Sequence, residues 1–213
     1  MLTLHDYLPS QNAYKVRLLL SHLRVPYRTR IVRIFDGDGQ SDRFLSLNPS
    51  GAVPVLELED GSTLAESNAI LVYLASGTPY LAADPWLLAQ QLRWMFWEED
   101  FIQNGLASLR HWTQTGKLAR RSTEAISQRR GASEKALRIL ERWLNGRGFL
   151  TDAGYSVADI SVFAYVSRAD EAGLRLKDYH CVSEWVERVR TQPGFLDEVH
   201  PYSLDPSSGN ELS

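Results

Sequence analysis

The sequence predicts an α/β domain followed by an all-helical domain, and three observations carry this prediction. Strand and helix patterns alternate through residues 1–78 in the order β-α-β-α-β-β-α. A proline-bearing linker follows at residues 79–85. From residue 86 to about residue 202, apolar side chains recur only at helical spacing, which indicates a helical bundle. Residues 203–213 are polar, and we expect this tail to fray.

The chain opens with a strand, a turn and a helix. Residues 1–6 are mostly apolar, which predicts a short buried strand that Pro9 breaks. From Gln11 onward, apolar residues at helical spacing predict a helix. It stops at Val25-Pro26, because the residue before a proline disfavours helical backbone. Residues 27–34 alternate between two faces and predict a second strand.

The first domain closes with a hairpin and a helix. Residues 36–39 form a predicted loop and residues 41–47 a short helix. Strands at 53–58 and 62–65 flank Asp60-Gly61, which is a strong hairpin signal. Apolar residues along one side of segment 67–75 predict the helix that ends the domain.

Four helices are predicted in the second domain, over residues 86–115, 123–144, 157–172 and 181–191. The third starts with a capping box, in which Ser156 caps the helix and Asp159 reaches back to it. It ends at Gly173. We interpret this pair as structural.

The composition excludes several classes of function. The 213 residues carry a formal net charge of -3, so no basic excess indicates a nucleic acid or an anionic membrane as partner. The single cysteine, Cys181, excludes a disulfide within the chain and a cysteine-rich metal site, and it fits a reducing cytoplasm. The N-terminus lacks the pattern of a signal peptide, and no run of 18 apolar residues predicts a membrane span.

Val53-Pro54 begins the third strand in an unusual way. Proline is tolerated at the first residue of a strand. A cis bond there would turn the backbone N–H and C=O of Val53 outward, free to pair with an extended peptide. The spacing alone favours the trans form, because only about 5% of X–Pro bonds are cis.

Glu66-Ser67 falls at the first turn of a predicted helix, where backbone N–H groups have no partner within the helix. These donors and the helix dipole favour a ligand carboxylate. The alternative is that Ser67 caps its own helix.

The motifs NPSGAVPVLE and LAESNAILVYLA, between the strand-turn opening and the helical second half, resemble the cytosolic glutathione S-transferases. The resemblance extends to about Tyr202, and the opening with Ser10 and Asn12 is most similar to bacterial theta-related and nu-like members. It implies a thioredoxin-like first domain, a cytoplasmic homodimer and a role in detoxification. It also implies that Val53 pairs with the cysteinyl backbone of glutathione, that Pro54 is cis, and that Glu66 and Ser67 hold the γ-glutamyl group.

The resemblance makes Ser10 and Asn12 the candidate catalytic residues. A catalyst that uses glutathione needs the thiolate, because the thiolate is the nucleophile. A hydroxyl or amide donor aimed at the sulfur favours that anion, and a nearby helix N-terminus adds to the effect. The sulfur belongs to the ligand, so the loop needs no cysteine. Capping of the first helix is the alternative role for Asn12.

Two positions depart from the family pattern. Relatives often carry a basic residue or glutamine before the Val-Pro pair, where it binds the glycyl carboxylate, but this chain has Ala52. A basic residue or histidine often precedes the second helix, where this chain has Gln40-Ser41. We therefore expect Gln40 or Arg43 to contact the glycyl carboxylate.

The aromatic side chains suggest where the electrophile binds. Tyr7, Trp97, Phe101 and Trp112 are candidates for the electrophile pocket, and core packing or dimer contact is the alternative for the three on the predicted helix. The acidic run 98–100 is expected on a solvated face, and the resemblance implies the alternative that an acid in this run reaches the γ-glutamyl amine of a partner subunit.

The predicted function is a glutathione transferase that attacks a hydrophobic electrophile with the glutathione thiolate, with no metal and no nucleic-acid or membrane partner. A glutathione-dependent disulfide reductase or peroxidase without a catalytic protein cysteine is one alternative. A non-catalytic binding protein of the same fold is the other.

Overall fold

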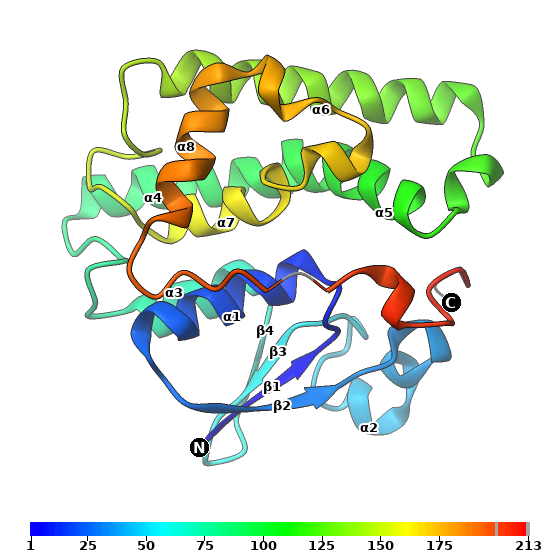
Figure 1. Ribbon diagram of the computed structural model, residues 1–213. Helices are drawn as coiled ribbons and strands as arrows, with labels where there is room; N and C mark the ends of the chain where they lie inside the picture. The colour runs from blue at the N-terminus through cyan, green and yellow to red at the C-terminus, as the bar shows by residue number, and fades with distance from the viewer. Residues whose placement is uncertain (199, 212–213) are drawn as a thin grey trace. The chain divides into compact units, whose positions relative to one another are not determined.

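The computed structural model describes residues 1–198 and 200–211 and contains two compact units (Figure 1). The N-terminal unit comprises residues 1–74 and the described residues from Leu196 onward. The helical unit comprises Ala75–Phe195. The C-terminal segment therefore returns to the unit in which the chain began. No helix among the described residues is long and apolar enough to cross a membrane.

The N-terminal unit is built on a mixed four-stranded sheet. Its strands are β1 (Leu2–Asp6), β2 (Tyr27–Ile31), β3 (Val55–Glu57) and β4 (Thr63–Ala65), in the order β2-β1-β3-β4. Strand β1 pairs parallel with β2 and antiparallel with β3, so that Leu4 lies opposite both Thr29 and Leu56. The helices are α1 (Gln11–Leu23), α2 (Asp42–Leu45) and α3 (Ser67–Ala75). The predicted order β-α-β-α-β-β-α and the thioredoxin-like architecture are confirmed.

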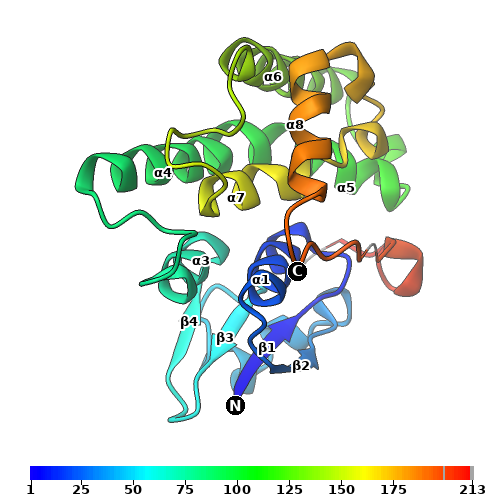
Figure 2. The same ribbon diagram turned by 60° about the vertical axis from the view of Figure 1, so that its left-hand side comes forward.

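Both faces of this sheet are covered. Helices α1 and α3 lie side by side on one face (Figures 1 and 2), where Leu4 and Leu56 pack with Val16, Leu20 and Ile70. On the other face, Val55 packs with Val32 and Phe44 of the α2 region. Val55 and Leu56 are neighbours in β3 and point to opposite faces, as the two-residue period of a strand requires.

The second and third strands are shorter than predicted. Strand β2 ends at Ile31 instead of Ile34, and two 3-10 turns follow at Ile34–Asp36 and Asp38–Gln40. The Asp38 carboxylate accepts hydrogen bonds from the backbone N–H and the side chain of Arg33, at 3.1 and 3.2 Å. Such local bonds compete with the sheet ladder and end it. Strand β3 begins after Pro54, which has no N–H to donate.

Five helices form the frame of the helical unit: α4 (Pro85–Trp97), α5 (Ser108–Gln114), α6 (Thr123–Leu144), α7 (Val157–Val166) and α8 (His180–Arg190). A π-helical segment, Glu98–Ala107, joins α4 to α5. Helix α6 has its predicted bounds, whereas the predicted helix 157–172 ends at Val166 and continues as a 3-10 turn at Ala169–Ala172. All ten residues of α7 are buried, so this helix is the centre of the unit's core.

The polar C-terminal segment needs a correction where the structure describes it. Tyr202–Leu204 forms a 3-10 turn, and the Tyr7 hydroxyl donates a hydrogen bond of 2.9 Å to Asp205. Asn210 donates to the backbone carbonyl of Phe35 at 3.4 Å. These side-chain contacts hold residues 202–211 on the N-terminal unit instead of leaving them frayed. The last two residues of the predicted tail lie outside the described part.

The capping box at α7 is present and fully buried. Asp159 accepts hydrogen bonds from the backbone N–H groups of Leu150 and Ser156, at 3.0 and 3.1 Å, and from the Trp185 indole at 2.9 Å. One carboxylate thus ties α7 to α8 and to the preceding loop. Burial raises the pKa of Asp159 to about 6, although the hydrogen bonds favour the charged form.

This raised pKa predicts a pH dependence of stability. The unfolded chain releases the Asp159 proton near pH 4, and the folded chain releases it only near pH 6. Between these values the folded state binds more protons, so the contribution of Asp159 to the free energy of unfolding falls as the pH rises. We expect this decline in the wild type and not in Asp159→Asn, measured by urea unfolding at pH 4 and pH 7. Equal slopes in the two proteins would contradict the assignment.

Candidate functional site

The predicted thiol-binding loop lies between β1 and α1. Ser10 is the N-cap of α1, and its Oγ accepts a hydrogen bond of 3.3 Å from the Ala13 N–H. A hydroxyl that accepts one bond keeps its own proton to donate. Ser10 is half-buried, so its hydroxyl can meet a ligand at the start of the helix.

A buried ion pair fixes this loop to the strand before it. Arg17 Nη1 lies 2.9 and 2.7 Å from the two carboxylate oxygens of Asp6, and Nη2 donates to the carbonyl of Leu8 at 3.0 Å. The Arg17 and Asp6 side chains are almost completely buried. Burial raises the pKa of Asp6, and the Arg17 guanidinium opposes the shift. The bond to the Leu8 carbonyl fixes the position of the backbone two residues before Ser10.

Asn12 and Ser67 meet in the structure, although 55 residues separate them in the sequence. The Ser67 hydroxyl donates to Asn12 Oδ1 at 3.5 Å. Ser67 also accepts a hydrogen bond of 3.4 Å from the ammonium of Lys15. The loop before α1 and the N-terminus of α3 therefore form one polar cluster, which we call the Asn12–Lys15–Ser67 cluster.

Glu66 has a backbone conformation that non-glycine residues rarely adopt. Its φ is +66°, in the left-handed region, and its side chain is exposed. Such conformations are concentrated at functional sites, where the surrounding structure holds them. The Glu66 carbonyl accepts the first helical bond of α3, from Ile70 N–H, so the backbone reversal at Glu66 directs the first N–H groups of α3.

The third predicted segment precedes β3. The Val53–Pro54 peptide bond is cis, as the resemblance implies. Asn48 braces this segment by donating to the carbonyl of Ala52 at 2.9 Å. Gly51 has a φ of +67°, and a β-carbon there would come within 2.7 Å of Gln40 Nε2. The exposed Gln40 amide is therefore adjacent to the NPSGAVP motif.

Arg43, the other candidate for the glycyl carboxylate, lines a hollow of about 250 Å³ with His5 and Phe44. The buried His5 ring contacts a Glu57 carboxylate oxygen at 2.7 Å. The structure thus associates Gln40 with the Gly51 turn and Arg43 with the region around His5.

Tyr7 is buried, with 3% of its surface exposed. Burial raises the pKa of the Tyr7 phenol, and the bond to the Asp205 carboxylate adds to the shift. The phenol is therefore neutral, and its proton is directed toward Asp205. Tyr14 donates to the carbonyl of Leu196 at 2.7 Å. Both hydroxyls are engaged by the C-terminal segment.

The other aromatic candidates belong to the helical unit. The rings of Trp97 and Phe101 stack with centroids 5.5 Å apart. The Trp112 ring carries the guanidinium groups of Arg121 and Arg129 over it, at 5.1 and 5.9 Å. The structure therefore brings Trp97 and Phe101 together, whereas Trp112 contacts two arginine side chains.

The acidic run 98–100 is not a uniformly solvated face. Glu98 is fully buried, and one of its oxygens accepts hydrogen bonds from Ser161 and Gln103, both at 3.3 Å. Glu99 is half-buried and Asp100 is exposed. Successive residues of a helix point in different directions, and here the first of the three points into the core.

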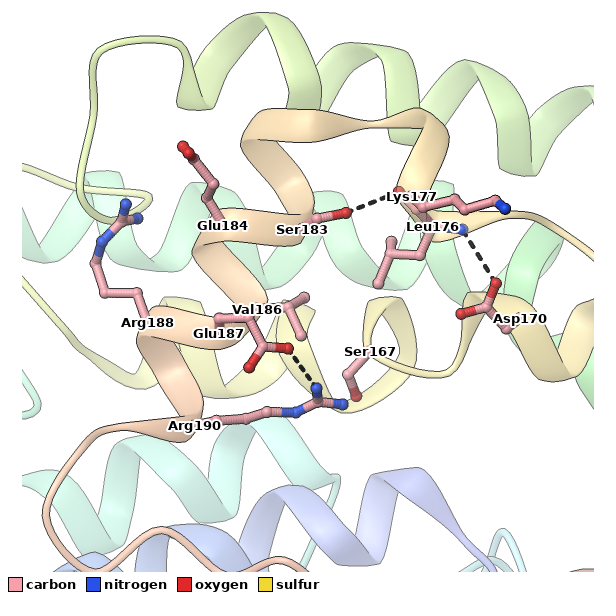
Figure 3. A pocket seen from close by; sticks show the side chains of 10 residues that line it. All are labelled: Ser167, Asp170, Leu176, Lys177, Ser183, Glu184, Val186, Glu187, Arg188 and Arg190. Carbon is pink, nitrogen blue, oxygen red and sulfur yellow. Dashed lines mark hydrogen bonds and ion pairs between the residues drawn. The ribbon is translucent and has the colours of Figure 1, made fainter.

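A hollow of about 620 Å³ lies beside α8 in the helical unit (Figure 3). Charged side chains line most of it, and several bind one another: Arg190 donates to Glu187, and Asp170 accepts from the backbone of Leu176. The lining contains none of the predicted site residues. Within the described residues, no group of three or more His, Cys, Asp or Glu side chains could hold a metal ion.

Two family models match the chain. The model of the N-terminal domain of glutathione S-transferase matches residues 9–76, and that of the C-terminal domain matches residues 102–193. The chain belongs to the glutathione S-transferase family. The matched regions of this glutathione S-transferase family member include the Asn12–Lys15–Ser67 cluster and residues 102–107 of the π-helical segment.

Individual relatives agree on the family and differ in activity. A crystal structure of a glutathione S-transferase from Pseudomonas fluorescens Pf-5 is 37% identical, with a TM-score of 0.89 over 92% of this chain and 97% of that one. The disulfide-bond oxidoreductase YfcG of Escherichia coli K12 is 27% identical over 88% of this chain and 89% of that protein. A glutathione transferase from Burkholderia graminis, crystallised with two glutathione molecules per subunit, is 26% identical, with a TM-score of 0.74 over 91% of this chain and 85% of that one.

Sequence reasoning did not identify Lys15 as part of the site. Lysines are usually exposed, and nothing in the local pattern shows that this one is completely buried. One signal was available, because Asn12 and Lys15 are three residues apart on a helix and therefore share a face.

Proposed function

We propose that this protein is a glutathione transferase that binds glutathione on the N-terminal unit and activates it as a thiolate for attack on a hydrophobic electrophile. The observation that carries the proposal is the hydrogen bond between Ser67 and Asn12, which joins the proposed thiol-binding and γ-glutamyl-binding segments. No cysteine lies in residues 1–74, so the thiol must come from the ligand.

The peptide would lie along three segments. Val53, with cis Pro54, offers its backbone N–H and C=O to the cysteinyl residue. Glu66 and Ser67 hold the γ-glutamyl group, whose carboxylate the first N–H groups of α3 favour. Gln40 contacts the glycyl carboxylate in place of the basic residue or glutamine that relatives often carry at the position of Ala52. The proximity of Gln40 to Gly51 supports this role.

Ser10 and Asn12 would stabilise the thiolate. A hydroxyl or amide proton directed at the sulfur lowers the pKa of the thiol by binding only the charged form well. The N-terminus of α1 adds a favourable field, because both residues lie at its first turn. The sulfur attacks the electrophile and forms a carbon–sulfur bond, and the leaving group departs with the electron pair of the bond that breaks.

In the helical unit, Trp97, Phe101 and Trp112 are the proposed contacts for an apolar electrophile, whereas Tyr7 is buried and donates its hydroxyl proton to Asp205. The stacked pair Trp97 and Phe101 supports this assignment, because aromatic faces bind apolar ligands well. The use of a single cysteine agrees with the cytoplasmic location that we propose.

Glutathione-dependent disulfide reduction is the second candidate, and the similarity to YfcG favours it. In this reaction the bound thiolate attacks a disulfide sulfur, the S–S bond breaks, and the released thiolate takes up a proton. A second glutathione thiol then reduces the mixed disulfide and leaves oxidised glutathione. Both reactions use the same thiolate, so the site alone does not separate them. A non-catalytic binding protein of the same fold is the third candidate function.

The function is tested by two assays on one preparation of the purified protein. We expect glutathione conjugation with a chloronitrobenzene substrate to exceed the uncatalysed rate and to exceed reduction of a small disulfide. Turnover of the disulfide alone would favour the reductase. Tight binding of glutathione without turnover in either assay would favour a binding protein.

The thiol donor is identified by two single substitutions. If Ser10 donates to the sulfur, Ser10→Ala removes a hydrogen bond to a charged acceptor, worth about 1.5–3 kcal/mol. The pKa of bound glutathione should then rise by about one to two units, measured from the thiolate absorbance. Asn12→Ala is the matched comparison. A rise in Asn12→Ala alone would transfer the role to Asn12, and no rise in either would reject both.

A two-fold homodimer is the proposed assembly. Trp86 and Phe96 expose 71% and 64% of their surfaces along α4. Exposed apolar side chains of this size favour an interface. Sedimentation at micromolar concentration should show twice the 24.1 kDa chain mass. A monomer that remains at that concentration would reject the proposal.

A further inference from the structure

Lys15 is a fully buried cation at the proposed γ-glutamyl end of the site. Its side chain has no exposed surface, and its ammonium donates to Ser67 Oγ at 3.4 Å. Burying an ammonium costs several kcal/mol unless polar neighbours compensate. The presence of a lysine, and not an apolar residue, at this buried position between α1 and α3 therefore needs a physical reason.

The Ser67 hydroxyl connects Lys15 to Asn12. It accepts from the Lys15 ammonium and donates to Asn12 Oδ1 at 3.5 Å. Because the oxygen of the Asn12 amide accepts this bond, its Nδ2 donor is turned away from Ser67. The charge on Lys15 thus orients the hydroxyl, and the hydroxyl orients the amide proposed to face the sulfur. Hydrogen bonds of this length in a free site commonly tighten when the ligand binds.

The charge also acts on whatever binds at Ser67. A ligand carboxylate oxygen that replaced Asn12 as the acceptor of the Ser67 hydroxyl proton would lie within about 6 Å of the Lys15 ammonium. An opposite charge at that distance favours the ionised ligand, and solvent screens a buried charge only weakly. Because Lys15 has no exposed surface, it does not contact a bound ligand directly.

We propose that Lys15 is a positioning residue that makes the site select a ligand with a negatively charged α-carboxylate at its γ-glutamyl end. It acts through Ser67 and adds its buried charge to the N-terminus of α3. This inference rests on the proposed glutathione site and deepens it, because it names the ligand group that Lys15 recognises and the path of recognition.

The test compares two ligands in two proteins. Glutathione is paired with 4-aminobutyryl-cysteinyl-glycine, which lacks only the α-carboxylate, and binding to wild type and Lys15→Met is measured by calorimetry. The preference is the ratio of the two dissociation constants, and we expect the wild type to prefer glutathione strongly. In Lys15→Met this ratio should fall at least about tenfold, as expected when an interaction with a charged group is lost. The cycle isolates the coupling between Lys15 and the carboxylate.

Three further variants separate this role from a structural one. Lys117→Met removes the other fully buried lysine, whose ammonium contacts His111, and should leave the preference unchanged. Ser67→Ala should reduce the preference as Lys15→Met does. Lys15→Gln, which keeps a donor without the charge, should also lose the preference and serves as the test if Lys15→Met does not fold.

The outcomes distinguish the two proposals. Equal loss of affinity for both ligands in Lys15→Met would assign Lys15 a structural role and overturn this inference while leaving the glutathione site intact. Failure of the wild type to bind either ligand would overturn the proposed function and this inference with it. Ligand-free thermal unfolding of each variant shows whether a loss of affinity reflects a loss of fold.

Discussion

The buried ion pair between Arg17 and Asp6 is the constraint on which the arrangement of the N-terminal unit depends. It joins the end of β1 to the middle of α1, and its third bond, to the Leu8 carbonyl, fixes the connecting loop. An ion pair removed from water stabilises a fold only when its geometry satisfies both charges, and here the two carboxylate oxygens both accept from Nη1. Removing Arg17 would leave the buried Asp6 carboxylate without this cation under the loop that carries Ser10.

Helix α1 therefore buries two cations with different tasks. Arg17 faces the sheet end and holds the loop, whereas Lys15 contacts Ser67 at the start of α3. The N-terminus of α1, which precedes both residues, is itself electropositive. The proposed ligand, a tripeptide with a carboxylate at one end and a thiolate near its centre, matches this local distribution of charge although the net charge of the protein is -3.

Strong periodicity made most of the fold predictable, and departures have local causes. Segments 67–75 and 123–144 have the predicted bounds, because each combines a clear apolar stripe with polar residues at its start. The π-helical segment at 98–107 was not predicted, because π-helices are rare and no local residue pattern marks this one. The Ser67–Asn12 contact joins residues that are far apart in the sequence, and no local pattern in a single sequence predicts such a contact. The roles of Ser10, Val53 and Gln40 came from the resemblance and stay predictions.

The return of the C-terminal segment to the N-terminal unit has a consequence for synthesis. Domains usually fold as units while the chain emerges from the ribosome, with the first domain ahead of the second. Here the first unit includes Leu196 and later residues, so Tyr7 and Tyr14 gain their hydroxyl partners only after the helical unit has been made. Until then the first unit lacks the Asp205 carboxylate and the Leu196 carbonyl, so the emergence of residue 74 does not complete its contacts.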